Sequence, residues 1–229
     1  MAPVDLRNPG RPLQVGIILV KDTTEILDVA PIDLLSAMSK SFIDDFPDDI
    51  MPPSLKSQAL DIVWHWVNQD GTPAALTCGV SANITDTFET CPPLDIAIMG
   101  ANSFSYEPSQ EELAFVRKTY DDCSAFLTIC GGFMVPMKAG LFAGKTATAP
   151  KMVLPMVRAQ TEKMPKEMRT TWTEERWHVS EDGKMWSSGA LLNGLDMMRE
   201  FGRRTWGGEG SLVEASLEMG GWPVRSREY

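Results

Sequence analysis

The chain has 229 residues, of which 43% are apolar and 23% are charged, and its formal net charge is −10. This composition is globular, and the acidic balance argues against nucleic acid or an anionic membrane surface as a partner, because no basic stripe neutralises phosphates. The N-terminal residues lack the apolar stretch of a signal peptide, and no run of 18 apolar residues predicts a membrane span. We therefore expect a cytoplasmic protein.

The cysteines and histidines predict neither a disulfide framework nor a metal centre. The spacing of the cysteines matches no zinc or CxxC pattern, and without a secretory signal we interpret them as free thiols. The two histidines, His65 and His178, are too isolated in the sequence to indicate a metal site. No cofactor is expected.

The first part of the chain reads as an arm followed by a strand and a helix. Residues 1–12 contain prolines and little apolar content, and we expect a loose arm before a single domain over residues 13–229. The β-branched run from 13 to 20 is typical of a buried parallel strand. Pro31 suits the first turn of a helix, so a helix is expected from about that residue, which leaves Asp28 in the preceding loop.

The middle of the chain predicts a loop, a hairpin and a second buried strand. Residues 41–57 contain four Asp and three Pro and indicate an exposed loop. The strand expected at 60–67 ends near an Asp70-Gly71 turn, which favours a hairpin with residues 75–77. A buried strand is expected at 94–99, and the Pro108-Ser109 pair signals a helix that runs to about Tyr120.

The most informative stretch is Ala125-Phe-Leu-Thr-Ile-Cys130-Gly-Gly-Phe-Met-Val135. A strand that ends on Cys130 and turns at once into a helix predicts a nucleophile elbow, with the thiol in a strained backbone conformation. Two glycines permit the tight turn, and the helix N-terminus is expected to favour the thiolate. The alternative from these residues alone is a buried structural cysteine.

The last third of the chain predicts further alternation of strands and helices. A short strand is expected within 144–149, a helix from Pro150 to Gln160, and a hairpin of 172–179 with 184–187. Helices are expected at 190–204, with Leu191, Leu192, Leu195 and Met198 inward, and at 211–219. This alternation predicts one α/β domain with a mostly parallel sheet.

Three features follow three of the expected parallel strands, and therefore share one edge of the sheet. They are Asp28, the Gly100-Ala101 pair and Cys130. A nucleophilic cysteine needs hydrogen-bond donors for a developing anion, and the amides of Gly131 and of Gly100 or Ala101 are candidates. A carboxyl group beside the thiol can act as acid or base.

Three side chains compete as the partner of Cys130. Asp28 is the first candidate, although this residue could instead have a purely structural role at the helix start before Pro31. Glu25 is the second candidate. His178 is the third, although a histidine in an apolar strand is more often structural, and His65, between two Trp residues, is interpreted as packing.

Three segments resemble the DJ-1/PfpI superfamily of class I glutamine-amidotransferase-like proteins. They are Leu27-Asp28-Val-Ala-Pro31-Ile-Asp-Leu-Leu, the stretch from Cys130 to Ala149, and the stretch from Asp182 to Asp196. Within the superfamily the chain looks closest to the isocyanide-hydratase-like, fungal-type branch. The resemblance implies a flavodoxin-like three-layer sandwich, a homodimer and a nucleophilic Cys130 paired with the Asp28 carboxyl. It also implies substrate-binding positions at Thr148 and Gly189.

The sequence departs from the superfamily pattern at three points. Most catalytic relatives have a His shortly after the Ala-Thr segment, whereas this chain continues Thr148-Ala-Pro150-Lys. The Leu-Asp motif is one residue shorter before Pro31 than in typical isocyanide hydratases, and Gly100-Ala101 replaces Pro-Gly-Gly. The missing His argues against protease and glyoxalase activity.

We therefore expect a small-molecule enzyme of the hydratase or hydrolase type, with Cys130 as nucleophile and Asp28 as acid and base. A second interpretation is an isomerase, lyase or cyclase of a biosynthetic pathway that uses Asp28 as base in the same pocket. A third is a non-catalytic redox-sensing or binding protein, in which Cys130 is oxidised to a sulfinic acid. The sequence does not identify the substrate.

Overall fold

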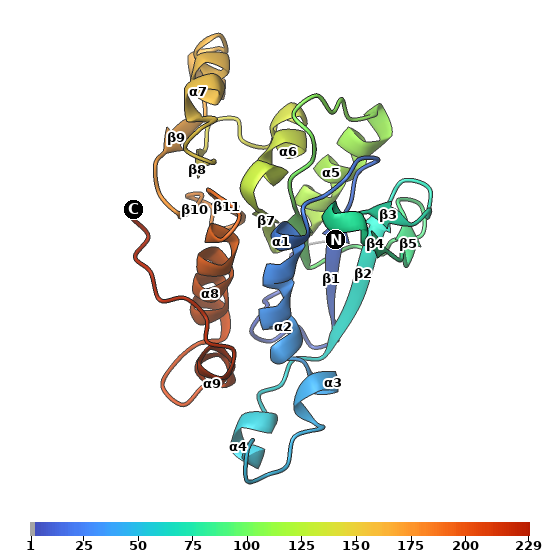
Figure 1. Cartoon of the computed structure of the whole chain (residues 1–229), viewed down its shortest axis with the longest axis vertical. Helices are drawn as coiled ribbons and strands as arrows, with labels where there is room; N and C mark the ends of the chain where they lie inside the picture. Colours follow the sequence, from blue (N-terminus) through green and yellow to red (C-terminus); the bar gives the residue numbers. More distant parts are fainter. Residues whose placement is uncertain (1–2) are drawn as a thin grey trace.

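A seven-stranded sheet forms the centre of the computed structural model, which describes residues 3–229 (Figure 1). The strand order is β10-β11-β7-β6-β1-β2-β5, and every neighbouring pair is parallel except β10 with β11. The strands are β1 (Leu13–Ile18), β2 (Ile62–Asn68), β5 (Asp86–Thr87), β6 (Ile96–Met99), β7 (Ala125–Thr128), β10 (Trp177–Val179) and β11 (Met185–Ser188). The mostly parallel sheet is confirmed.

Helices cover both faces of this sheet, which gives the expected three-layer, flavodoxin-like sandwich. The α-helices are α1 (Ile26–Val29), α2 (Asp33–Ala37), α3 (Lys40–Ile43), α4 (Pro53–Lys56), α5 (Gln110–Asp122), α6 (Met134–Lys138), α7 (Leu154–Glu162), α8 (Asn193–Trp206) and α9 (Leu212–Met219). One apolar cluster joins α5, α6 and α7 to the sheet, and a second joins α2, α8 and α9 to its other face. Successive residues of a strand point to opposite faces, so Ile96 and Ile98 belong to one cluster and Ala97 and Met99 to the other.

The expected hairpin after β2 is wrong. β2 is parallel to β1 on one side and to β5 on the other, so neither edge is free for residues 75–77. Instead β3 (Ala74–Ala75) pairs antiparallel with β4 (Ser81–Ala82) in a separate small sheet. The Asp70-Gly71 turn exists, with Gly71 at φ +76°, but it leads the chain away from β2.

The helix expected from Pro31 begins earlier, and this corrects the position of Asp28. The chain becomes helical at Ile26, so Asp28 lies in α1 and not in a loop. Pro31 then lies at the start of a short 3₁₀ segment, Ala30–Ile32, before α2. A proline donates no backbone hydrogen bond, which accounts for the tighter 3₁₀ step between the two α-helices.

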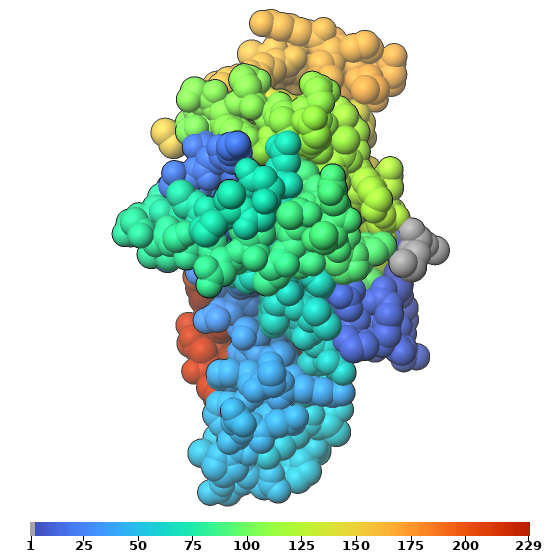
Figure 2. All heavy atoms as spheres, turned by 90° about the vertical axis from the view of Figure 1, so that its right-hand side faces the viewer, coloured from blue at the N-terminus to red at the C-terminus, as the bar shows by residue number. Residues whose placement is uncertain are grey.

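Two other segments are more ordered than the sequence predicted. The region 41–57 contains most of α3 and all of α4, and it buries Ile43 and Met51; it forms one end of the molecule, opposite α7 (Figures 1 and 2). Residues 3–12 contain no helix or strand, but the arm is anchored and not loose. The Arg7 side chain donates to the carbonyl oxygens of Arg204 and Thr205, and Arg11 pairs with Asp95.

The last third agrees with the sequence in its hairpin and helix positions. β10 and β11 form an antiparallel hairpin, but only residues 177–179 of the expected first strand take part in it. Residues 171–173 form β9 (Thr171–Thr173), which pairs parallel with β8 (Thr146–Thr148) in a further small sheet. The inward face of α8 agrees at Met198, which is buried together with Met197 and Phe201, and differs at Leu192, which is 50% exposed and precedes the helix. Within residues 3–229, no helix has both the length and the apolar character needed to cross a membrane.

Candidate active site

Cys130 lies in the turn that leaves β7, and its backbone has the predicted strained conformation. Its φ is +54°, in the left-handed region that side chains rarely adopt. A 3₁₀ turn, Cys130–Phe133, follows directly and continues into α6. The strand, the cysteine at positive φ and the helical turn together confirm the elbow.

Gly132 allows this turn to pass close to β6. A Cβ atom built on Gly132 would lie 2.8 Å from the carbonyl carbon of Met99 and 2.9 Å from that of Gly100. Both contacts are with backbone, which cannot rotate away. Only glycine fits here, and the close approach brings the elbow against the residues that follow β6.

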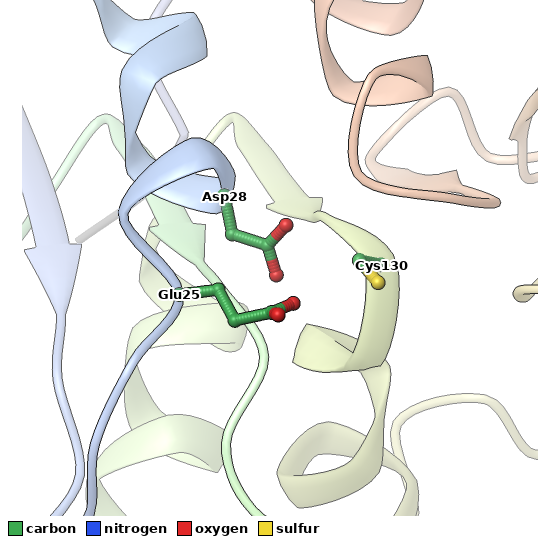
Figure 3. Close-up of side chains that lie close together, drawn as sticks. All are labelled: Glu25, Asp28 and Cys130. Carbon is green, nitrogen blue, oxygen red and sulfur yellow. The ribbon is translucent and has the colours of Figure 1, made fainter. Parts of the chain in front are cut away.

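Asp28 and Glu25 both direct their carboxyl groups at the Cys130 thiol (Figure 3). One oxygen of each carboxyl group and the Cys130 sulfur all lie within 4.8 Å of one another. α1 carries Asp28, and the segment just before it carries Glu25. The structure therefore places the first and second sequence candidates side by side at the elbow.

Gly100 makes room for Asp28. A Cβ atom at this position would lie 2.8 Å from the Asp28 Cβ and 2.9 Å from the Thr24 Cγ2. The Asp28 side chain is completely buried, and the Ala101 N–H donates to its Oδ2 at 2.6 Å. Its Oδ1 has no hydrogen-bond partner among the described residues.

Burial dominates the electrostatics of Asp28. Loss of water, with a smaller contribution from the nearby Glu25 carboxyl group and against the opposing effect of the Ala101 N–H, raises the pKa of this carboxyl group to about 7. Near neutral pH the group is therefore present in both its acid and its base form, which is the condition that general acid–base catalysis needs.

The expectation that the elbow favours the thiolate is wrong. Burial is the largest influence on the Cys130 thiol, and together with the Asp28 and Glu25 carboxyl groups it raises the pKa to about 12. The N–H groups of Gly131 and Leu191 donate to the sulfur and act in the opposite direction. The helical segment after Cys130 is short, so its dipole does not offset desolvation and two acidic neighbours.

Of the amides predicted to stabilise an anion, only that of Gly131 is available at the cleft. Gly131 lines the cleft beside Cys130 and donates its amide to the sulfur. The Ala101 amide is already used by Asp28, so it is not a free donor for a substrate. The second donor at the sulfur is Leu191, which sequence reasoning missed because no local signal distinguishes a loop amide.

Thr148 and Gly189 do not line the cleft. Thr148 is completely buried, and its hydroxyl donates to the carbonyl oxygens of Thr173 and Glu175. The Gly189 N–H donates to the Arg176 carbonyl oxygen at 2.8 Å. Both residues are structural supports, and the cleft wall near Gly189 is formed by residues 190–193.

The histidines are also structural. His178 bonds through Nδ1 to Glu175 at 2.6 Å and does not line the cleft, so it is not the partner of Cys130. His65 is buried between Asp86 and Gln14, at 2.8 Å from each. The two histidines thus hold strands and loops in place.

A cleft of about 1000 Å³ opens over the elbow. The end at the elbow contains Cys130, Gly131 and Glu25. Most of the remaining wall is apolar, with Phe104, Phe133, Met134, Met152, Val153 and Leu191 among its residues. Four polar residues from later parts of the chain also line the cleft: Arg176, Asn193, Arg225 and Tyr229. This volume is at the upper end of the range for drug-sized ligands.

A hydrogen-bond network fixes the loop that carries Leu191. The Asn193 Oδ1 accepts from the Ala190 N–H at 2.9 Å and from the Tyr229 hydroxyl at 2.6 Å. Asp196 binds the other side of Asn193 and pairs with Arg225 at 2.8 Å. The Leu191 amide is thereby held against the sulfur by residues far along the chain.

The same three acidic groups are the one trio in the described part of the chain that offers a metal three close ligand atoms. A metal here would have to displace the protons that Asp28 and Cys130 hold near neutral pH, because carboxylate and thiolate are the ligating forms. The trio therefore fits proton transfer beside a thiol better than metal binding.

Comparisons with known proteins agree with the fold. No protein-family model matches the chain. The isonitrile hydratase of Pseudomonas putida is 25% identical over 212 residues, which are 90% of this chain and 78% of that protein. A ThiJ/PfpI family protein from Pseudomonas syringae superposes with a TM-score of 0.66 at 16% identity, over 94% of this chain and 77% of that one. The chain has the fold of this ThiJ/PfpI family protein, and its similarity to isonitrile hydratase extends over most of its length.

A second solved structure shows how widely this fold is shared. The DJ-1beta of Drosophila melanogaster superposes with a TM-score of 0.66 at 12% identity, over 93% of this chain and all of that one. At such identities the structural likeness concerns the fold. The assignment to the fungal-type, isocyanide-hydratase-like branch stays a prediction.

The influence of Glu25 on the thiol is directly testable. Glu25→Gln removes a negative charge beside the sulfur, so we expect the pKa of Cys130 to fall and its alkylation by iodoacetamide at pH 8 to become about three- to tenfold faster. The measurement is the alkylation rate from pH 7 to 10 by intact mass. Glu111→Gln, an equal charge change on the exposed side of α5, should leave the rate unchanged; an unchanged rate in Glu25→Gln would contradict the coupling.

Proposed function

We propose that the protein is a cysteine-dependent enzyme that adds water to a small molecule, with an isonitrile as the substrate class. The observation that carries the proposal is the buried acid beside the elbow thiol: Asp28 has a pKa of about 7 and lies within 4.8 Å of the Cys130 sulfur. The likeness to isonitrile hydratase supports the choice of substrate class.

Cys130 begins the proposed reaction. Its sulfur forms a bond to the terminal carbon of the isonitrile while the Asp28 carboxyl group gives its proton to that carbon. The thiol proton passes to the acidic pair, through Glu25 at the cleft wall, so Asp28 is protonated again. The product of this step is a thioimidate, in which the carbon carries one hydrogen, the sulfur and the C=N bond.

Water completes the proposed reaction. It adds to the thioimidate carbon, its oxygen bonding to carbon and one proton going to nitrogen. The C–S bond then breaks, the hydroxyl proton returns to sulfur through the acidic pair, and an N-substituted formamide leaves. The Gly131 and Leu191 amides stabilise the departing sulfur. The sum is isonitrile plus water giving formamide, with no oxidant or reductant.

The acid–thiol pair favours this chemistry over peptide hydrolysis. An isonitrile needs a proton at carbon and a nucleophile at the same atom, which one neutral carboxyl group and one thiol supply together. The homodimer implied by the resemblance and the expected cytoplasmic location stay part of the proposal, and the four free cysteines fit a reducing compartment.

The test is turnover of aliphatic and aromatic isonitriles, with formamide detected by mass spectrometry after dialysis against EDTA. We expect activity in the wild type and a loss of at least about 10³-fold in Cys130→Ser, since the nucleophile of a covalent mechanism is removed. Cys123→Ser, at a buried cysteine outside the cleft, is the matched control. Full turnover in Cys130→Ser would exclude the mechanism.

The same experiment separates the lyase alternative. If Asp28 acts alone as a base on another substrate, Cys130→Ala should lower the rate less than Asp28→Ala does. Under the hydratase proposal both changes abolish formamide formation, because the sulfur forms a bond in the first step. Formation of a sulfinic acid at Cys130 with no isonitrile turnover would instead favour the redox interpretation.

A further inference from the structure

The cleft over Cys130 extends well beyond the reacting groups, and its wall is mainly apolar. Its volume of about 1000 Å³ far exceeds what an isonitrile group alone would fill. Three of its apolar residues are unusually exposed: Met152 at 85%, Phe104 at 62% and Leu192 at 50%. Exposed apolar residues gathered in one cleft favour a ligand with a large apolar body.

Arg176 provides a fixed positive charge in the same cleft. Its Nη1 donates to the carbonyl oxygens of Ser226, at 2.9 Å, and Glu228. These bonds hold the guanidinium group in place but do not neutralise it. Within residues 3–229 Arg176 makes no ion pair, in contrast to Arg225, which is paired with Asp196 at 2.8 Å.

Lys151 adds a second charge beside the first. Its Nζ lies 3.8 Å from the centroid of the Tyr229 ring, and the Arg176 guanidinium carbon lies 4.7 Å from the same centroid. Lys151 also makes no ion pair in the described part of the chain. Two cations without carboxylate partners thus surround one aromatic ring at the edge of an apolar cleft.

The acidic side chains of the cleft lie elsewhere. Glu25 belongs to the trio at Cys130, and Asp22 lines the cleft from the same segment that precedes α1. Figure 1 shows the C-terminal end of the chain, which carries Tyr229, beside β9 and β10 and well apart from α1. An anionic ligand group is repelled near Cys130 and attracted near Tyr229, so the charge distribution sets one orientation of the ligand.

We propose that the cleft binds an amphiphilic substrate with a large, aromatic-sized apolar body and an anionic group, and that Arg176 and Lys151 bind the anionic group beside Tyr229. This names the substrate class of the proposed hydratase and rests on that function for the reaction. The binding site itself is tested without turnover. The anion fixes one end of the molecule, and the reactive group reaches Cys130 at the other.

The probe is the fluorescent anion 8-anilinonaphthalene-1-sulfonate, compared with N-phenyl-1-naphthylamine, which has the same aromatic body and no charge. We expect the sulfonate to bind wild type more tightly than the neutral compound. Arg176→Gln should weaken sulfonate binding by at least about tenfold, the effect of losing a charge-assisted contact, and leave the neutral compound unchanged. Arg176→Lys keeps the charge and should restore most of the affinity.

Two further measurements locate the probe. Bound sulfonate should slow alkylation of Cys130 by iodoacetamide, since both occupy the cleft, and Lys118→Gln, an exposed charge change on α5, should alter neither binding nor protection. Three results would each overturn the proposed anion site. They are equal affinity for both compounds, an unchanged sulfonate affinity in Arg176→Gln, and an unchanged rate of Cys130 alkylation when the sulfonate is bound. Because none of these readouts uses an isonitrile, the site and the hydratase function can fail separately.

Discussion

Asp28→Asn is expected to stabilise the protein by about 2 to 4 kcal/mol at pH 8 while lowering turnover by about 10² to 10⁴-fold. Burial raises the pKa of this carboxyl group from 3.8 to about 7. Asparagine has the same shape and keeps an oxygen for the Ala101 N–H, but it carries no charge to desolvate. It also cannot give or take the proton that the proposed reaction moves.

The stability effect must depend on pH in a defined direction. Below about pH 4 both the folded and the unfolded chain hold the Asp28 proton, and the buried carboxyl group costs nothing extra. Between about pH 4 and 7 the unfolded chain loses the proton first, so the wild type loses stability as pH rises. Above about pH 7 the full penalty is present, and the advantage of Asp28→Asn is largest.

Urea unfolding of wild type and Asp28→Asn at pH 4.5 and pH 8 measures this difference. The free energy of unfolding of the variant should exceed that of the wild type at pH 8 and be close to it at pH 4.5. Asp33→Asn is the matched control, since Asp33 is exposed in the adjacent α2. A gain of equal size at both pH values would show that the titration of Asp28 is not its cause.

Gly132→Ala is expected to destabilise the protein by at least about 3 kcal/mol, enough to prevent folding of a marginal domain. The new methyl group would overlap the Met99 carbonyl and lie 2.9 Å from the Gly100 carbonyl carbon. Relief requires the elbow to move away from β6, which would also separate Cys130 from Asp28. The substitution should therefore lower the stability of the fold and disrupt the arrangement of Cys130 and Asp28 at the same time.

Chemical unfolding and circular dichroism of Gly132→Ala test this expectation. Gly202→Ala in α8 is the control, because its new Cβ would lie 3.3 Å from the Leu34 Cδ2 and 3.5 Å from the Val213 Cγ1. Both are side-chain atoms that can shift, and alanine is the better helix former. We expect the control to unfold within about 1 kcal/mol of wild type; a similarly mild effect of Gly132→Ala would refute the close approach.

Several elements of this protein were predictable because their causes are local. The run Ile96–Met99 is uniformly apolar, as a strand buried on both faces must be. Ser109 and Glu112 form a complete capping box at the start of α5, bonding to each other's backbone N–H at 3.1 and 2.7 Å. The Asp182-Gly183 turn joins β10 to β11, with Gly183 at the positive φ that the turn requires.

Other elements depended on which strand edges were available. Residues 60–77 contain a turn signal that fits a hairpin, but β2 already has β1 and β5 as neighbours. The chain around Pro31 has a helix-start signal, but packing begins the helix at Ile26. Local signals specify a turn or a start and not the partner that the segment finds, so such predictions fail when a distant strand or helix competes.

The sequence by itself determined the elbow, since a strand, Cys130 and two glycines suffice to specify it, and it named Asp28 and Glu25 as candidates. Only the tertiary structure decided the protonation of the site. Cys130 has a raised pKa because folding buries it beside two carboxyl groups, and this outweighs a short helix dipole. The Leu191 amide, Arg176 and Tyr229 are brought to the cleft by folding alone, because a charge or an amide gains its role from its neighbours in space and not from those in the chain.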